Sequence, residues 1–383
     1  MLLMNGDRPV LYFDLDERVM KVLDNQFLPF RLKDYIVSTD TSSIWAYRES
    51  VRGIDDLRDF LACRTLNLSR ENAKAILHSA KLSQSLSTEE RLKIVFHCNA
   101  LSMTDNFWVK DDDDKRTFSE VNLRNHHLGD AAYQISILGE QISVQKGILE
   151  PDLGTDGMFA KTWVRTDDGI YLWKADIHHM GLVLAEQMAS DFLDHTNVPH
   201  VQYHTIEKDG ILISECKSIV SDDVSIVKGI EFSDYLRHIR YPKYGYRTAL
   251  EAFLATDERT RIDFRKMCCA DVLMCNPDRH LDNIHLLVDN GTNEIMGLTL
   301  LDHNQAFLFD LKGTNDPEVF LQYSYDVSRR PILETAKRYV TDLEIDPDYS
   351  MSEEMLYRFE MLYGKEPLID DPNTEDFEEE QTI

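Results

Sequence analysis

The residues best suited to chemistry lie in the segment 276–283, which reads Asn-Pro-Asp-Arg-His-Leu-Asp-Asn. Asp278 and Asn283 in this segment are separated by four residues. A carboxylate such as that of Asp278 can take the proton of a hydroxyl group that attacks as a nucleophile. The amide oxygen of Asn283 is a hard ligand of the kind that Mg²⁺ prefers. A short loop can therefore present both groups to one reacting centre.

A second acidic residue, Asp302, follows an apolar strand that is predicted over 295–301. This strand and the one predicted over 284–288 are joined by the Asp-Asn-Gly turn at 289–291, which is typical of a hairpin. Because the far end of a hairpin returns beside its start, we expect Asp302 to lie next to Asn283. One carboxylate and one amide at that point would bind Mg²⁺, with phosphate oxygens as further ligands.

Lys174 is a charged residue near the end of an apolar strand predicted over 170–175, and Glu186 follows in a helix predicted over 181–195. A strand lysine that contacts phosphate groups and is held by a helix glutamate is an arrangement that protein kinases use. The apolar residues expected on one face of that helix are Leu182, Ala185, Met188, Ala189 and Phe192. Glu186 lies beside this face, and a solvent-facing position is the alternative for it.

The segment before these strands contains two glycines, Gly154 and Gly157. Glycine lets the backbone approach phosphate groups closely, so the segment is a candidate phosphate loop. It matches neither common glycine-rich phosphate motif, and a plain turn is the alternative. Asp278 and Asp302 also have a turn-forming alternative, since Asp is favoured in turns. The order of all these parts along the chain is what favours a shared function.

The elements that must position these residues divide the chain into regions. Strands are predicted over 161–165, 169–175, 201–206 and 210–214, and helices over 248–255, 261–275, 331–341 and 352–363. We therefore predict an α+β fold with two lobes of the protein-kinase type, a β-rich N-lobe over 101–215 and a helical C-lobe over 216–369. Residues 1–100 are predicted to form a small N-terminal accessory region, with a strand over 10–13 and helices over 57–63 and 70–82. Residues 370–383 are acid-rich and predict a disordered tail.

The composition narrows the function classes. The chain has 383 residues, and 41 Lys and Arg against 68 Asp and Glu give a net charge of −27. A chain this acidic is a poor general binder of nucleic acid or of an anionic membrane. It lacks an apolar stretch long enough to span a membrane and an N-terminal pattern typical of a signal peptide. Six cysteines without a CxxC pair favour reduced, mostly buried thiols and a cytoplasmic location.

In these motifs and their order the chain resembles the HipA-like serine/threonine kinases, a bacterial and phage branch of the protein-kinase-like fold. That family carries a D-x-H-x-x-N catalytic loop, which here is Asp-Arg-His-Leu-Asp-Asn at 278–283. The resemblance covers about 101–309 well and the first hundred residues only loosely. It implies ATP and Mg²⁺ as cofactors, transfer of the γ-phosphate to a protein hydroxyl, and an antitoxin-like partner.

The resemblance also implies a role for each matching residue. Asp278 is the expected catalytic base, and Asn283 and Asp302 are the expected metal ligands. The expected nucleotide-binding residues are Asp156, Gly157, Met158, Phe159, Ala160 and Lys161 of the phosphate loop, Lys174 with Glu186, the hinge residues Glu215, Cys216 and Lys217, and His280, Asn283 and Asp302.

The chain departs from the familiar protein kinases at its catalytic motifs. Asp-Arg-His at 278–280 replaces His-Arg-Asp, and Asp-His-Asn at 302–304 replaces Asp-Phe-Gly. The first of these also resembles the phosphoinositide kinases, so a lipid or small-molecule kinase is an alternative, with the basic residues between 237 and 247 as a candidate surface. A nucleotide-binding toxin-system module without turnover is another alternative. Thr155 is the candidate site if the chain phosphorylates its own phosphate loop.

Overall fold

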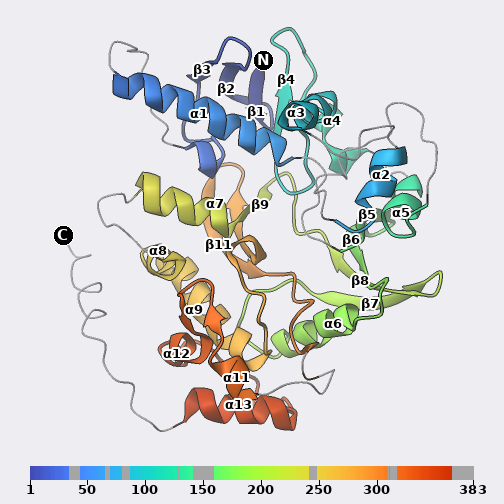
Figure 1. Cartoon of the computed structure of the whole chain (residues 1–383), viewed down its shortest axis with the longest axis vertical. Coiled ribbons are helices and arrows are strands. Elements are labelled where there is room, and N and C mark those ends of the chain that lie inside the picture. The colour runs from blue at the N-terminus through green and yellow to red at the C-terminus, as the bar shows by residue number, and fades with distance from the viewer. Residues whose placement is uncertain are drawn as a thin grey trace.

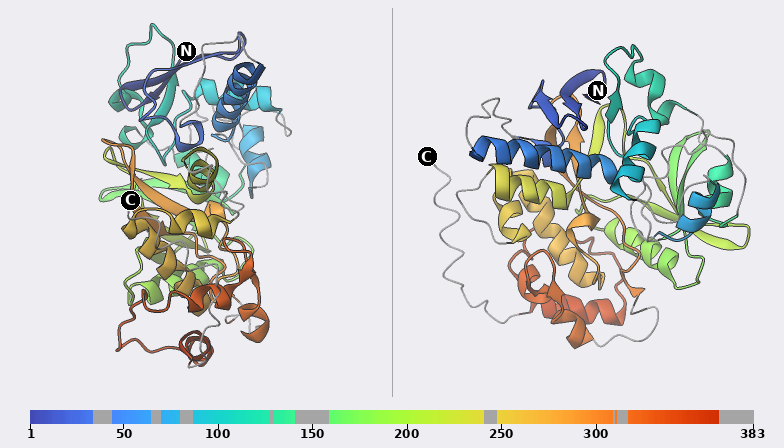
Figure 2. Two further views of the ribbon diagram at one scale, coloured as in Figure 1. Left: turned by 90° about the vertical axis from the view of Figure 1, so that its left-hand side faces the viewer. Right: turned by 45° about the horizontal axis from the view of Figure 1, so that its top comes forward.

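The structure is a computed structural model of the chain. It describes residues 1–33, 44–64, 70–79, 87–126, 130–140, 159–240, 248–308, 310 and 317–364. The fold is mixed α and β with several antiparallel sheets, as the sequence predicts in outline. Figures 1 and 2 show an elongated molecule with the N-terminal sheet at one end and the last helix at the other.

The N-terminal sheet has the order β3-β2-β1-β4. Its strands are β1 (Leu2–Asn5), β2 (Arg8–Asp14), β3 (Val19–Val22) and β4 (Phe107–Lys110). Helices α1 (Ile44–Ala62) and α3 (Thr88–His97) pack with it around a buried apolar cluster that includes Phe13, Leu57 and Val95. Because β4 pairs with β1, this sheet extends past residue 100, where the sequence places the end of the accessory region.

A second antiparallel sheet has the order β5-β6-β8-β7. Its strands are β5 (Lys161–Thr166), β6 (Gly169–Ala175), β7 (Tyr203–Lys208) and β8 (Ile211–Lys217), close to the predicted ranges. Helix α6 (Leu182–Leu193) packs against β7 and β8, and α2 (Ala73–Ser79) and α5 (Asp130–Ser136) lie at the β5 side. The prediction for one face residue of α6 is wrong, because Met188 is exposed with Leu184 on the outer face while Ala185 and Ala189 are buried.

The third sheet has the order β11-β10-β9 and lies in the middle of Figure 1. Its strands are β9 (Val224–Lys228), β10 (Ile284–Asp289) and β11 (Glu294–Leu300), and the predicted hairpin is formed with Ile284 opposite Leu300. Helices make up the rest of this part of the chain. They are α7 (Gly229–Asp234), a π-helix (Tyr235–Arg240), α8 (Ala249–Leu254), α9 (Glu258–Leu273), α11 (Pro317–Leu321), α12 (Ile332–Lys337) and α13 (Glu353–Tyr363). Short elements complete this part: η6 (Leu281–Asn283), β12 (Ser324–Tyr325) and β13 (Arg330–Pro331). The largest buried apolar cluster holds these helices together around α9.

The N-terminal sheet is attached to both of the other parts. The η1 turn (Phe30–Leu32) places Phe30 edge-to-face on Phe232 of α7. At the tip of the β10–β11 hairpin, the Asn293 side chain donates to the carbonyls of Gln26 and Leu28 at 2.7 and 2.9 Å. The short helices α4 (Phe118–Val121) and η2 (Leu123–Asn125) share one buried apolar cluster with Trp163 of β5. The N-terminal region is therefore packed against the rest of the chain along a broad contact.

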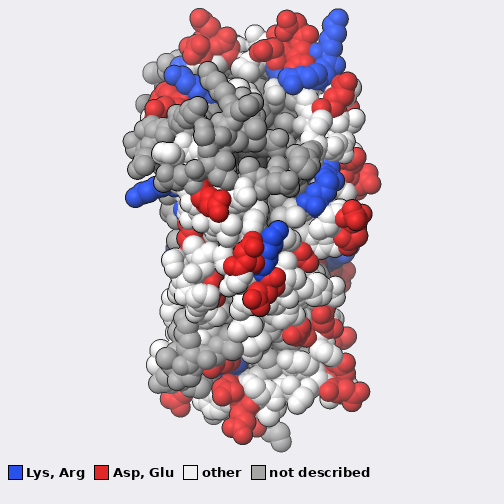
Figure 3. Space-filling model, turned by 90° about the vertical axis from the view of Figure 1, so that its right-hand side faces the viewer, with Lys and Arg blue, Asp and Glu red and all other residues white. Residues whose placement is uncertain are grey.

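The surface is acidic and the cysteines are thiols rather than disulfides, as the composition predicts. Acidic side chains are spread from end to end over the face shown in Figure 3. All six cysteines are free thiols, and four of them are buried. No helix among the described residues has the length and apolar character needed to cross a bilayer. Of the basic residues between 237 and 247, the structure describes the Arg237 side chain, and those from 238 to 247 lie outside its description.

Candidate active site

A cavity of about 510 Å³ lies between the β5–β8 sheet and the β9–β11 sheet. This volume is in the range of pockets that hold a small ligand or cofactor. The cavity has a charged part and an apolar part, at different positions along β6. The charged and amide residues are Lys161, Lys174, Lys217, Lys228, Asp278, Asp282, Asn283, Asp302 and Asn304, and the apolar ones include Met103, Leu172, Val201, Cys216, Ile219, Val220, Ile226 and Leu301.

Lys174 is the centre of the charged part. Its ammonium group is buried and donates to Glu186 Oε1 at 2.7 Å and to Asp302 Oδ1 at 2.9 Å. The other oxygen of Glu186 accepts from Ser214 Oγ at 2.6 Å, which fixes the buried glutamate. Burial by itself would lower the pKa of Lys174, but the charges of Asp302 and Glu186 outweigh it and raise this pKa well above its usual value. The lysine is therefore a permanent cation in the cavity.

Asp302 follows β11 and joins that hairpin to the lysine. Burial would raise the pKa of its carboxyl, but Lys174 and then Lys161 lower it well below the usual range. Its backbone N–H donates to the hydroxyl of Tyr203 at 3.0 Å, and its φ of 63° lies in the left-handed region that is costly for a residue with a Cβ. Strained residues of this kind concentrate at functional sites.

The predicted catalytic loop follows α9 and opens onto the same cavity. The amide nitrogen of Asn283 donates to the carbonyl of Asp278 at 2.9 Å and to its Oδ2 at 3.3 Å. Because the nitrogen makes these bonds, the oxygen is the atom of Asn283 that can serve a cation. His280 Nε2 lies 3.8 Å from Asp278 Oδ1. Burial, together with the charge of Asp302, raises the pKa of Asp278.

A buried ion pair that the sequence reasoning missed supports this loop. Arg279 and Asp271 of α9 have fully buried side chains, and Arg279 Nε lies 3.1 Å from Asp271 Oδ2. The same guanidinium donates to the carbonyl of Asn283 at 2.6 Å, and the same carboxylate accepts from Tyr325 OH at 2.6 Å. The signal for Asp271 in the sequence is a single acid within the apolar run 267–275.

The residues assigned to the phosphate loop fall in different places. Asp156, Gly157 and Met158, like Thr155, lie outside the described residues. Phe159 and Lys161 line the cavity, and Lys161 is the cross-strand neighbour of Lys174. Ala160 is buried, and its N–H donates to Glu71 Oε2 at 2.9 Å. Two lysines on adjacent strands therefore face the charged part of the cavity.

The expected hinge is divided between the two faces of β8. Cys216 pairs with Leu172 and lines the cavity, and the strand end adds Lys217 and the following segment 218–220, which the sequence reasoning omitted. The Lys217 side chain itself lies by Tyr171, on the face that also carries Glu215. On this face Glu215 Oε2 accepts from Trp173 Nε1 at 2.7 Å. The floor of the cavity adds Ile226, Lys228 and His285 from β9 and β10. Burial lowers the pKa of His285 to about 3, so this imidazole is neutral.

The oxygen ligands in the cavity suit Mg²⁺ that is also bound by substrate phosphates. In the described part of the chain, they do not form a site in which the protein alone surrounds a metal ion. The described residues contain no group of three or more His, Cys, Asp or Glu side chains arranged to hold a metal ion. They do bring the two predicted ligands, the carboxylate of Asp302 and the amide of Asn283, to the same cavity. Mg²⁺ commonly takes one or two such protein ligands and completes its shell with water and substrate phosphates.

No family model and no curated protein matches the chain. Solved structures do. Two of the chains that match are a toxin–antitoxin protein and a kinase. The toxin–antitoxin protein HipA of Shewanella oneidensis MR-1, solved with HipB and operator DNA, matches with a TM-score of 0.48 and 12% identity over 94% of this chain and 95% of its own. The Helicobacter pylori proinflammatory kinase CtkA matches with a TM-score of 0.38 and 15% identity over 54% of this chain and 87% of its own.

Both matches are distant in sequence and in structure. The HipA chain belongs to the family that the motifs resemble, and the CtkA chain is also a kinase.

Proposed function

We propose that the chain is an ATP- and Mg²⁺-dependent kinase of the HipA-like type that transfers the γ-phosphate to a serine or threonine hydroxyl of a protein. The observation that carries this proposal is the double contact of Lys174 with Glu186 and Asp302, inside a cavity that also receives Asp278 and Asn283. A strand lysine, a helix glutamate, a loop aspartate with its asparagine and a strand-end aspartate are the parts that kinases use.

In this proposal the two lobes are the β5–β8 sheet with α6 and the helical region around α9, with the cavity between them. The ranges proposed for the lobes are 101–215 and 216–369, with 1–100 as the accessory region and 370–383 as the tail, although β4 (Phe107–Lys110) is part of the N-terminal sheet. The same resemblance implies a protein substrate, an antitoxin-like partner and a cytoplasmic location, and all three belong to the proposal.

Each residue then has a task that its surroundings support. Lys174 and Lys161 neutralise phosphate charge, and Glu186 holds Lys174 in place. Asn283 and Asp302 supply the oxygen ligands for Mg²⁺, which when bound neutralises phosphate charge. Asp278 orients the acceptor hydroxyl and takes its proton. Phosphoryl transfer needs mainly such positioning and charge neutralisation, because its transition state is loose.

Transfer of label from [γ-³²P]ATP tests the proposal. The wild-type chain is incubated with a panel of proteins and with vesicles that contain phosphoinositides, with and without Mg²⁺. We expect Mg²⁺-dependent label in protein, its loss in Asp278→Ala, and ATP binding by calorimetry retained in that variant. Glu334→Gln, an exposed change on α12, is the matched control and should behave as wild type.

The other outcomes separate the alternatives. Label in the vesicles would favour a lipid kinase, which the net charge of −27 disfavours because anionic membranes repel acidic surfaces. ATP binding without any transfer would favour a module without turnover. The absence of ATP binding by the wild-type chain would sink the proposal altogether.

A further inference from the structure

We infer that the N-terminal region, meaning the N-terminal sheet with the segment up to Asn125 that includes β4, α4 and η2, is part of the nucleotide site, because Met103 lines its base end and Asn106 and Arg124 hold the adjoining loop. The inference rests on the proposed function and deepens it by adding residues that position the base. They lie outside the motifs that carry the kinase resemblance.

The cavity has a chemical direction along β6. Lys174 and Leu172 lie two positions apart, so their side chains are on the same face of the strand, and both line the cavity. The phosphates of a nucleotide belong near Lys174, where Asp302 also lies. The flat apolar base belongs near Leu172 and Cys216, which are part of one apolar cluster with Ile219.

Met103 adds the N-terminal region to this base end. Its side chain lines the cavity and is only 3% exposed. It belongs to an apolar cluster that contains Trp108 of β4 and Trp163 of β5, with Leu172 packed against it. Leu172 thus contacts the hinge cluster on one side and the N-terminal cluster on the other. A thioether adapts well to a flat apolar ligand.

The backbone next to Met103 is tied to the cavity floor. The carbonyl of Thr104 accepts from the N–H of Ile226 in β9 at 2.8 Å. Strand β9 is the edge of its sheet, so this bond uses the free edge and fixes the distance between the N-terminal segment and the floor. Ile226 itself lines the cavity.

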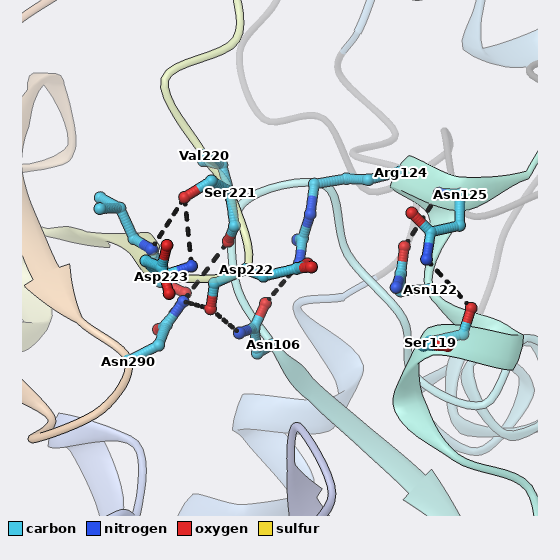
Figure 4. Close-up of polar contacts among 12 residues, drawn as sticks. Asn106, Ser119, Asn122, Arg124, Asn125, Val220, Ser221, Asp222, Asp223 and Asn290 are labelled. Atoms are coloured by element: carbon cyan, nitrogen blue, oxygen red, sulfur yellow. Dashed lines mark hydrogen bonds and ion pairs between the residues drawn. The ribbon is translucent and has the colours of Figure 1, made fainter.

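A second set of contacts, drawn in Figure 4, holds the loop after the hinge. The buried Asn106 accepts from Arg124 Nη2 at 2.8 Å and donates through Nδ2 to the carbonyl of Asp222 at 3.2 Å. Arg124 Nη2 also lies 3.0 Å from Asp222 Oδ1. Asp222 follows Val220, which lines the cavity. The N-terminal region therefore restrains the segment that covers the base.

The same loop is held from its other side by the hairpin. Asn290 Nδ2 donates to the carbonyl of Asp222 at 3.0 Å, and Asn290 Oδ1 accepts from Ser225 Oγ at 2.7 Å. One carbonyl thus receives an amide from the N-terminal region and an amide from the β10–β11 turn. Loss of the contribution from Asn106 leaves the loop attached but less restrained, so that base binding should weaken while the fold persists.

Calorimetric dissociation constants of the full chain for ATP and for inorganic tripolyphosphate, each with Mg²⁺, test the inference. Met103→Ala and Asn106→Ala should each raise the dissociation constant for ATP about tenfold. This change equals a loss of about 1.4 kcal/mol of binding free energy. Tripolyphosphate has no base, so its affinity should be unchanged, which also shows that the variants are folded. In transfer assays KM for ATP should rise and kcat should stay the same.

Two further variants sharpen the test. Arg124→Gln should weaken ATP binding, whereas Arg124→Lys should bind ATP nearly as wild type does. The hydrogen bonds of Arg124 to Asn106 and Asp222 both use Nη2, which the ammonium group of lysine can replace. Asn125→Ala is the matched control, since the Asn125 amide donates to Ser119 within the N-terminal region, also shown in Figure 4. It should bind ATP as wild type does.

The outcomes distinguish this inference from the proposed function. If the wild-type chain binds ATP and both Met103→Ala and Asn106→Ala bind it equally well, the inference alone is overturned. Equal weakening for ATP and tripolyphosphate would also overturn it, because the effect would not be at the base end. If the wild-type chain does not bind ATP, the proposed function and the inference fall together.

Discussion

Removal of the Asp271 carboxylate should destabilise the chain far more than removal of a surface acid. Asp271 and Arg279 have fully buried side chains, and their charged groups lie 3.1 Å apart. The substitution Asp271→Ala leaves the fully buried guanidinium without its counter-charge. It also leaves the hydroxyl of Tyr325 and the amide of Asn276 without their acceptor.

The magnitude follows from the burial. Breaking a buried ion pair by removing one partner costs about 3–5 kcal/mol, because the remaining charge is not solvated. Against a total stability of about 5–15 kcal/mol, this is a large fraction. At about 2 °C per kcal/mol for a chain of this size class, the Tm should fall by roughly 6–10 °C. Arg279 also donates to the carbonyl of Asn283, so the predicted catalytic loop at 278–283 should be the first part to loosen.

Glu334→Ala is the matched control, because it also removes one acid that contacts arginine. Glu334 lies 3.3 Å from Arg330 and 3.4 Å from Arg338, and its own side chain is 48% exposed. Exposed pairs of this kind contribute about 0.3–0.5 kcal/mol each. Urea unfolding of the two variants should therefore differ by at least 2 kcal/mol. Equal midpoints would refute the assignment of Arg279 and Asp271 as the support of the catalytic loop.

Three further outcomes are expected. Lys174→Met should reduce the rate of phosphoryl transfer at least a hundredfold, since a preorganised charge contributes a factor of about 10²–10³ to kcat. The double variant Lys174→Met with Glu186→Gln should be more stable than Lys174→Met and equally slow in transfer. Asp302→Asn should raise the Mg²⁺ concentration needed for half-maximal transfer about tenfold or more, while calorimetric binding of metal-free ATP persists. Burial raises the pKa of Cys216 to about 12, so at pH 9 maleimide should label it far more slowly than the exposed Cys63, with equal rates in urea. Because the unfolded thiol loses its proton above about pH 8.5 and the folded one does not, the contribution of Cys216 to stability should fall as the pH rises.

Sequence patterns were sufficient where the contacts are local in the chain. The β10–β11 hairpin brings Asp302 back to the cavity that Asn283 lines, as the turn at 289–291 predicts. Lys174 and Glu186 are joined because one strand and the next helix pack together, and their periodicities are visible in the sequence. In both cases a single supersecondary unit determines which side chains meet.

Patterns were insufficient where partners come from distant segments. Tyr325 meets Asp271 from a different part of the helical region, and no local periodicity relates the two positions. Strand β4 pairs with β1 across about a hundred residues, so the boundary predicted at residue 100 does not mark the end of that sheet. Met188 was misplaced because the apolar stripe of α6 is broad, and packing against β7 and β8 selects which part of it is buried.

Asp278 and Asp302, two carboxylates of the cavity, have pKa values that are moved in opposite directions. Lys174 outweighs burial at Asp302 and holds the pKa of that carboxyl far below its usual range, so Asp302 remains an anion that can bind a cation. Asp278 has no such lysine contact in the described structure, and burial with the charge of Asp302 raises its pKa. Neighbouring groups whose pKa values are moved apart are the usual sign of divided acid–base roles. Lys174 thus makes Asp302 the weaker base of the two, and this supports the proposal that Asp278 takes the proton of the acceptor hydroxyl.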